Sequence, residues 1–168
     1  MDTITLPDEK LLNQIRVIRN QKIMFDSDLA ELYGVETKVL NQAVKRNIDR
    51  FPQDFMFQLT GEEWKDLKSQ FVTSSWGGRR TPPFVFTEQG VAMLSSVLNS
   101  KRAVQVNISI MRVFVKMREF ATNYSGLLEK IKELQNSDNE QNQHISNIYR
   151  IIEELVKPQL DNKNPIGF

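Results

Sequence analysis

Cysteine is absent from the 168 residues, and histidine occurs only once. The lack of cysteine excludes disulfide bonds and thiolate metal sites, and it is typical of proteins from a reducing compartment. The single histidine, His144, lies beside Ile145 in a segment with a heptad pattern, where a solvated role is favoured over catalysis. We therefore expect no enzymatic activity, no metal site and no cofactor.

Long apolar runs are also missing. No stretch approaches the roughly 18 uncharged residues that a membrane span requires. The first ten residues, MDTITLPDEK, contain no apolar signal core. We therefore expect a cytoplasmic protein with no membrane-spanning segment.

A strong charge of one sign is the third feature that the sequence lacks. The net charge is +1; residues 1–122 carry 17 basic and 14 acidic side chains, and the remainder carries 5 basic and 7 acidic. Any nucleic-acid binding must therefore depend on a local basic patch rather than on the field of the whole protein.

Residues 26–47 read DSDLAELYGVETKVLNQAVKRN, and their apolar spacing predicts two short helices joined by a tight turn, a helix-turn-helix. Asp26 or Ser27 is expected to cap the first helix, which ends at Gly34 because glycine adopts the left-handed conformation without steric cost. Capping and the helix dipole explain the acidic residues Asp26, Asp28 and Glu31 better than a metal site does. The side chains expected between the two helices are Leu29, Ala30, Tyr33, Val35, Leu40 and Ala43.

The outer face of the second helix is polar and basic. Its side chains recur at spacings of three and four: Thr37, Lys38, Asn41, Gln42, Lys45 and Arg46. Asn and Gln can pair with adenine edges, Thr can contact a thymine methyl group, and Lys and Arg can reach guanine or phosphate. Helix 37–47 is therefore predicted to read the major groove of double-stranded DNA. A solvated face on an ordinary helical hairpin is the alternative.

Residues 73–83, TSSWGGRRTPP, combine a Gly-Gly pair, a Pro-Pro pair and two arginines, and they predict an exposed loop. A basic loop between strands, downstream of a recognition helix, has the layout of a wing. Arg79 and Arg80 are then expected to bind phosphate or to enter the minor groove. A loop whose arginines are simply solvated is the alternative.

A small β component and further helices are predicted around these segments. Strands are expected at residues 15–18, 22–25, 55–59 and 84–86, the first two as a hairpin and the third with one face in the core. Residues 1–10 are expected to be frayed, and an N-terminal helix through Leu11, Leu12 and Ile15 competes with the hairpin. Thr60 and Glu63 form a capping-box pattern before a helix over residues 61–70, and Thr87 is expected to cap a helix over residues 88–98.

A longer helix is predicted from Ser100, with apolar residues on two sides, so it is expected to be a core helix. One stripe comprises Val104, Ile108, Met111 and Val115, and the other comprises Val106, Ile110, Val113 and Met117.

Beyond Phe120 a heptad pattern begins, interrupted at Asp138 and Gln141 and ending before Pro158. Isoleucine at a positions with mostly leucine at d positions favours a parallel two-stranded coiled coil, and therefore a homodimer. The seam consists of Leu127, Ile131, Leu134, Ile145, Ile148, Ile152 and Leu155. A single amphipathic helix that folds back on the rest of the chain is the alternative.

Four strings spread over the first 120 residues carry a family resemblance: DSDLAELYGVETKVLNQAVKRN, RFPQDFMFQLT, TSSWGGRR and FTEQGVAMLSSVLNS. The region from Ile15 to Arg118 resembles the KilA-N superfamily of DNA-binding domains, in the branch named for the N-terminal domain of a phage open-reading-frame-six protein. The resemblance implies a compact α+β DNA-binding domain of phage or prophage ancestry, often fused to a variable C-terminal part.

The expected fold is therefore α+β: a winged or wing-like helix-turn-helix head over residues 1–122, a coiled-coil helix over 123–157 and a flexible tail over 158–168. The expected function is sequence-specific binding of double-stranded DNA by a transcriptional regulator or antirepressor-like protein. A non-enzymatic protein-interaction module that oligomerises through its C-terminal coil is the alternative.

Overall fold

The computed structural model describes residues 6–70, 79–137 and 150, and the fold is α+β. One antiparallel sheet has the strand order β1-β2-β4-β3. The strands are β1 (Ile15–Ile18), β2 (Gln21–Phe25), β3 (Met56–Gln58) and β4 (Phe84–Thr87). The helices are α1 (Asp8–Gln14), α2 (Asp26–Tyr33), α3 (Thr37–Arg46), α4 (Gly61–Gln70), α5 (Glu88–Leu98) and α6 (Lys101–Ser137), with a short 3-10 helix, η1 (Ile48–Arg50), after α3.

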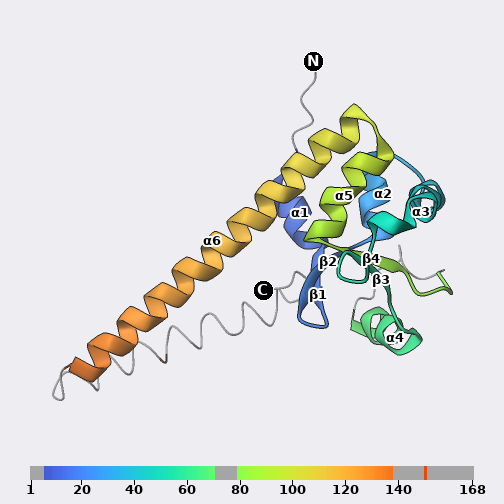
Figure 1. Ribbon diagram of the computed structural model, residues 1–168. Helices are drawn as coiled ribbons and strands as arrows, with labels where there is room; N and C mark the ends of the chain where they lie inside the picture. Colours follow the sequence, from blue (N-terminus) through green and yellow to red (C-terminus); the bar gives the residue numbers. More distant parts are fainter. Residues whose placement is uncertain (1–5, 71–78, 138–149, 151–168) are drawn as a thin grey trace.

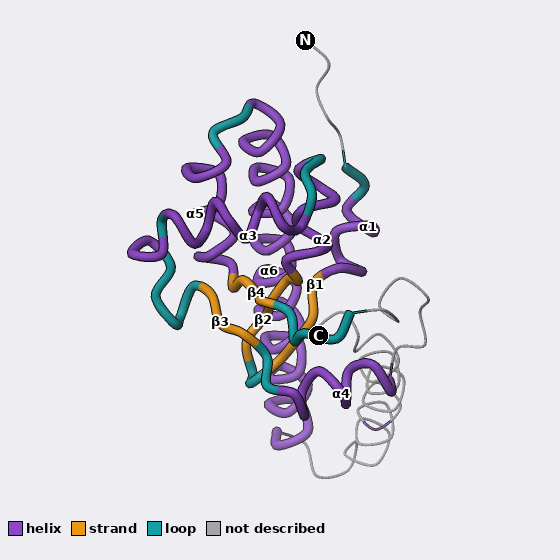
Figure 2. Tube along the Cα trace, turned by 90° about the vertical axis from the view of Figure 1, so that its right-hand side faces the viewer, coloured by secondary structure: helices purple, strands orange, loops and turns teal. Residues whose placement is uncertain are grey.

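Helices lie on both sides of the sheet. In Figures 1 and 2, α1, α2, α5 and α6 lie on one side, α3 packs outside α2 and α5, and α4 lies on the other side. Successive strand residues point to opposite faces, so Met24 and Phe86 join the larger hydrophobic cluster. Phe25 and Val85 join a smaller cluster with Trp64 of α4. Both faces of the central strands are therefore buried.

Strand β3 differs from the prediction because helices cover both faces of the sheet. Residues 55–59 were expected to place only one face in the core, but Met56 packs against the larger cluster while Phe57 packs against the smaller one. Alternation of apolar and other residues identifies a strand, but it does not show that a helix covers the second face. The strand itself is confirmed at Met56–Gln58.

The N-terminal region contains both of the competing elements. The hairpin is confirmed, with Ile15 opposite Met24, and its turn uses Arg19 and Asn20 with φ of 51° and 60°. Positive φ at both central residues is typical of the tight turns that match strand twist. The helix α1 precedes the hairpin and fully buries Leu11. Fraying over residues 1–10 is therefore wrong for residues 8–10, because α1 begins at Asp8.

Two predicted helix caps are confirmed. Before α4, the backbone N–H of Thr60 donates to Glu63 Oε2 at 2.8 Å, and the N–H of Glu63 donates to Thr60 Oγ1 at 3.2 Å. Before α5, Thr87 Oγ1 accepts a bond of 3.4 Å from the N–H of Gly90. Each cap satisfies backbone donors that the first helical turn leaves unpaired.

Helix α6 buries only one of its two apolar stripes. Val106, Ile110, Val113 and Met117 lie in the core, whereas Val104, Ile108 and Val115 are exposed. The predicted core helix is therefore confirmed through its inner stripe, whereas no described element covers Val104, Ile108 and Val115 of the outer stripe. Asn107 fixes α6 to the helices beneath it by accepting a hydrogen bond from the Tyr33 hydroxyl and donating to Val91 O at 2.7 Å.

Helix α6 also continues without a break past residue 122 and through Gly126, far beyond the sheet (Figure 1). Of the predicted coiled-coil seam, Leu127, Ile131 and Leu134 lie on this helix, and Leu127 is 51% exposed. The other seam residues, Ile145, Ile148, Ile152 and Leu155, and the tail 158–168 lie outside the described residues. Within the described part of the chain, no helix combines the length and apolar character needed to cross a bilayer.

Candidate nucleic-acid interface

The predicted pair of helices and the turn between them are present as α2, residues 34–36 and α3. Gly34 has φ 71°, and the Val35 N–H donates to Ala30 O at 3.0 Å, which closes the end of α2. The apolar residues expected between the helices behave accordingly: Leu29, Ala30, Tyr33 and Leu40 are buried, and Val35 and Ala43 are half-buried. Arg102 of α6 supports the turn by donating from Nε to Leu32 O at 2.9 Å.

Helix α3 presents a charged and polar side to solvent. It buries Leu40 and Val44, it half-buries Thr37 and Asn41, and it contains no acidic residue. The exposed side chains are Lys38, Val39, Gln42, Lys45 and Arg46. Among the ion pairs between described residues, none involves Lys38, Lys45 or Arg46. Three cations therefore stand on one helix face with no internal counter-charge among those residues.

A hollow of about 580 Å³ runs along one flank of this face. Its apolar floor comes from Val44 of α3, from η1 and from two strands, and its polar wall comes from α3. The lining residues are Lys38, Asn41, Gln42, Val44, Lys45, Ile48, Met56 and Phe84. A second hollow, of about 610 Å³, lies on the outer side of α5 and α6 and has no lining residue from α3. Of these two hollows, the cationic face therefore adjoins the first.

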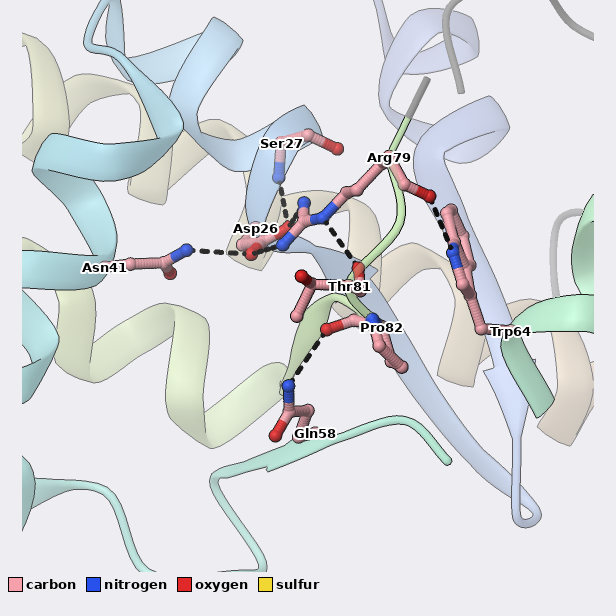
Figure 3. A network of polar contacts seen from close by, with 8 residues as sticks. All are labelled: Asp26, Ser27, Asn41, Gln58, Trp64, Arg79, Thr81 and Pro82. Atoms are coloured by element: carbon pink, nitrogen blue, oxygen red, sulfur yellow. Dashed lines mark hydrogen bonds and ion pairs between the residues drawn. The ribbon is translucent and has the colours of Figure 1, made fainter. Parts of the chain in front are cut away.

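Asp26 is the polar centre beneath this face (Figure 3). Its side chain is fully buried, and both carboxylate oxygens accept from the Arg79 guanidinium, at 2.7 and 2.8 Å. Oδ1 also accepts from the Ser27 N–H at 2.8 Å, and Oδ2 accepts from Asn41 Nδ2 at 2.9 Å. A buried carboxylate needs this number of donors to offset its lost hydration. The network therefore joins three parts of the chain: α2, α3 and the segment that leads into β4.

This geometry extends the predicted role of Asp26. The sequence suggested Asp26 or Ser27 as a helix cap, and Asp26 does accept one backbone N–H of the first turn. The helix itself begins at Asp26, however, and Phe25 occupies the capping position without a side-chain hydrogen bond. Asp26 is thus mainly the acceptor for Arg79 and Asn41, which a local capping rule cannot detect.

Among the described residues, two of the eight predicted DNA-contacting residues therefore have hydrogen-bond partners inside the protein. Arg79 is held by Asp26, and its main-chain oxygen accepts from Trp64 Nε1 at 3.4 Å and from Lys68 Nζ at 2.7 Å. Asn41 gives one amide N–H to Asp26. Arg80 is exposed, while residues 73–78 of the predicted wing lie outside the described residues.

A second acidic residue of α2 lies in an unfavourable environment. Burial raises the pKa of Asp28 to about 6, and the nearby Arg16 guanidinium opposes that shift while Glu31 and Asp26 add to it. Its Oδ2 is buried and accepts no hydrogen bond from a described residue. Burial in turn lowers the pKa of Arg16. In the described part of the chain, no three His, Cys, Asp or Glu side chains are grouped so that they could hold a metal ion.

The model of the ORF6N domain matches residues 13–97, half of the chain. The chain belongs to the ORF6N domain family. The match spans the sheet and α2 to α5, so the ORF6N domain contains the cationic face of α3 and the Asp26 network, while α6 follows it. No curated protein and no solved structure matches this chain.

Family membership supports the phage-type character that the resemblance implied, because the domain is that of a phage ORF6 N-terminal region. The wider link to the KilA-N superfamily stays a prediction. Sequence reasoning did not single out Val39 or Ile48, which are exposed beside the predicted contacts. Their exposure becomes evident only when the two buried residues of α3, Leu40 and Val44, define which side of the helix faces inward.

Proposed function

We propose that this protein binds double-stranded DNA in a sequence-specific manner, with α3 in the major groove. The observation that carries the proposal is the outward side of α3, where Lys38, Lys45 and Arg46 are exposed without an acidic partner among the described residues. A helix is the element that the major groove accommodates, and unpaired cations on it gain free energy by displacing counterions from phosphates. The proposed function includes no enzymatic activity.

Phosphate contacts and base contacts are assigned to different positions on α3. Lys45 and Arg46 lie in the last turn, where they suit phosphates that orient the domain. Base contacts are assigned to the remaining polar residues, namely Thr37, Lys38, Asn41 and Gln42. Because α3 enters the groove N-terminus first in this arrangement, its first two turns contact base edges.

The hydrogen bond from Asn41 to Asp26 is compatible with a contact between Asn41 and a DNA base. An asparagine amide has two N–H donors and a carbonyl acceptor, and only one N–H is used by Asp26. The second N–H and the carbonyl oxygen match the N7 acceptor and N6 donor of adenine. Since the carboxylate can accept only from the NH₂ side, it also fixes which way the amide faces. Asn41 is thus oriented before DNA binds, which reduces the entropy lost on binding.

The proposed wing contributes through Arg80. Arg79 is occupied by Asp26 and sets the position of the segment, whereas Arg80 is the exposed cation next to it. Arg80 is therefore the better candidate for a phosphate contact, and Arg79 acts mainly by holding the base of the loop against α2 and α3. This division is part of the proposal and refines the equal roles that the sequence suggested.

Dimerisation would place two such faces on one DNA site. Apolar Leu127 is 51% exposed on α6, and Ile131 lies four residues further along the helix, the spacing of a coiled-coil seam. A parallel coil would make the second head's contact with DNA intramolecular and favour paired half-sites. A transcriptional regulator or antirepressor-like protein of a phage or prophage is the role that fits these properties.

A protein-interaction module is the second candidate, and the outer face of α6 favours it. Val104, Ile108 and Val115 are exposed there beside the hollow of about 610 Å³. This reading predicts no DNA affinity that depends on salt, and it predicts that removing charge from α3 has no effect. The DNA experiment below therefore separates the two candidates.

The test is selection of bound sequences from random double-stranded DNA with the full-length protein, followed by titration of the winning sequence against salt. Arg46→Ala should weaken binding to every sequence and reduce the slope of log affinity against log salt by about one unit, as expected for one lost phosphate contact. Lys65→Ala is the matched control, because Lys65 is an exposed cation on α4, on the far side of the sheet. No enrichment of any sequence, or equal effects of the two variants, would overturn the proposal.

A further inference from the structure

Val39 is an apolar residue on the cationic face of α3. It is the third residue of the helix and is 47% exposed, and it belongs to neither hydrophobic cluster of the described residues nor to the apolar side chains packed against them. One exposed valine on a protein surface is ordinary and carries no meaning by itself. The exposed residues around Val39 on α3 suggest a specific role for it.

Helical spacing places Val39 in line with Gln42 and Arg46, three and seven residues further along α3. Both of these residues are exposed, whereas Leu40 and Val44 are buried in the core. Val39 therefore lies on the side of the helix that the proposed function turns toward DNA. It also lies in the first turn, the part of a recognition helix that approaches base edges most closely.

The base edges in the major groove offer only one apolar group, the C5 methyl of thymine. The purines present their N7 acceptors in the groove, and cytosine has only a hydrogen atom where thymine carries the methyl group. A valine has no polar atom in its side chain, so it would leave such groups desolvated and unpaired. The chemistry of Val39 thus selects thymine among the four bases.

We propose that Val39 contacts the C5 methyl of a thymine in the target site and makes thymine preferred at that position. The inference rests on the proposed function, because it requires α3 to enter the major groove. It adds a specificity-determining residue that hydrogen-bonding considerations alone would miss. Gln42, one turn further along, then reads a neighbouring base pair.

The experiment compares thymine with deoxyuridine, which differs from it only by the absence of the methyl group. Each thymine of the selected DNA sequence is replaced singly by deoxyuridine, and the affinity of the full-length protein is measured by fluorescence anisotropy at fixed salt. One position in each half-site should lose affinity about three- to fourfold, the effect of one buried methyl group. Val39→Ala should bind thymine and uridine at that position equally well.

Two further variants make the result specific. Val104→Ala removes a valine of nearly the same exposure, 48%, from α6, and it should keep the full uridine penalty. Val39→Thr keeps the shape of the side chain but replaces one methyl group by a hydroxyl, so it should show a reduced penalty.

A uridine scan with no penalty at any position, or a penalty that Val39→Ala retains, would overturn the inference while leaving DNA binding intact. Failure of the wild-type protein to select any sequence would instead remove the proposed function itself. The two failures are therefore distinguishable in the same series of measurements.

Discussion

At the scale of single residues, the molecule depends on one carboxylate that no local pattern would reveal. Asp26 is fully buried, while the Arg79 side chain that binds it keeps 29% of its surface exposed. The two ends of this ion pair therefore lose different amounts of hydration. Removing the arginine leaves a buried carboxylate with only two donors, whereas removing the carboxylate leaves a guanidinium that water still reaches.

This asymmetry gives a quantitative prediction. Asp26→Asn should lower the free energy of unfolding by about 2 kcal/mol, and Arg79→Met should lower it by about 3–4 kcal/mol, because an unpaired buried charge costs more than an unpaired solvated one. The double variant should cost less than the sum by about 1–2 kcal/mol. Urea unfolding followed by circular dichroism measures all three values.

The exposed pair Arg118–Glu88 is the control for this cycle, since its side chains keep 53% and 30% of their surfaces exposed. Arg118→Met should change stability by less than about 1 kcal/mol. Strictly additive effects at Asp26 and Arg79 would show that the two residues are not energetically coupled.

The residues of the candidate site were predictable only where a local rule applies. The exposed cations of α3 follow from helical spacing, and the Thr60–Glu63 box follows from a four-residue pattern. The pairing of Asp26 with Arg79 spans 53 positions, so it depends on how the strands bring two segments together. The spacing of residues within one sequence contains no information on such a pair.

At the scale of elements, α5 lies in close contact with the segment before β3. The Thr87 N–H donates to Phe55 O at 3.0 Å, and its hydroxyl donates to Asp54 O at 2.7 Å. Gly90 lies against the same carbonyl: a Cβ atom placed there would be 2.0 Å from Phe55 O. The backbone oxygen cannot withdraw without breaking its bond to Thr87.

Gly90→Ala should therefore destabilise the protein by about 3 kcal/mol or more, the range typical of overpacking against a rigid neighbour. Gly126→Ala provides the opposite case, since a Cβ atom there would meet nothing within 4 Å and the position is helical. That substitution should raise the helicity of α6 and add up to about 1 kcal/mol of stability. Thermal unfolding of both variants, followed by the helical signal in circular dichroism, measures both changes in stability.

The elements themselves were largely predictable, because each follows from periodicity and capping. The hairpin, the helix pair around Gly34, and α4 and α5 with their caps all lie within a few residues of their predicted bounds. Periodicity does not show how many faces of a helix or strand are covered by other elements. Thus Met56 packs against the core, and Val104, Ile108 and Val115 of the outer stripe of α6 are exposed.

At the scale of the whole molecule, one apolar line runs along α6. Val106, Ile110, Val113 and Met117 pack into the head, and the same line continues at spacings of three and four to Leu127 and Ile131 beyond it. In the proposed dimer, this continuous helix would transmit the orientation of the coil directly to the ORF6N domain. The spacing of two α3 helices on DNA would then be set by the crossing geometry at the start of the coil, with no flexible linker in between.

The last prediction tests this arrangement on the full-length chain. The double variant Leu127→Glu, Ile131→Glu should weaken self-association by about a hundredfold or more, because each buried aliphatic side chain contributes about 1.5–3 kcal/mol. Val115→Glu, on the exposed outer stripe of the same helix, should leave self-association unchanged. Sedimentation velocity over a range of concentrations compares the three proteins. A wild-type protein that stays monomeric would remove the coiled coil, and dissociation caused by Val115→Glu alone would move the dimer contact to the outer face of α6.

If the prediction holds, the monomeric variant should still bind a single half-site but lose the added affinity for paired half-sites.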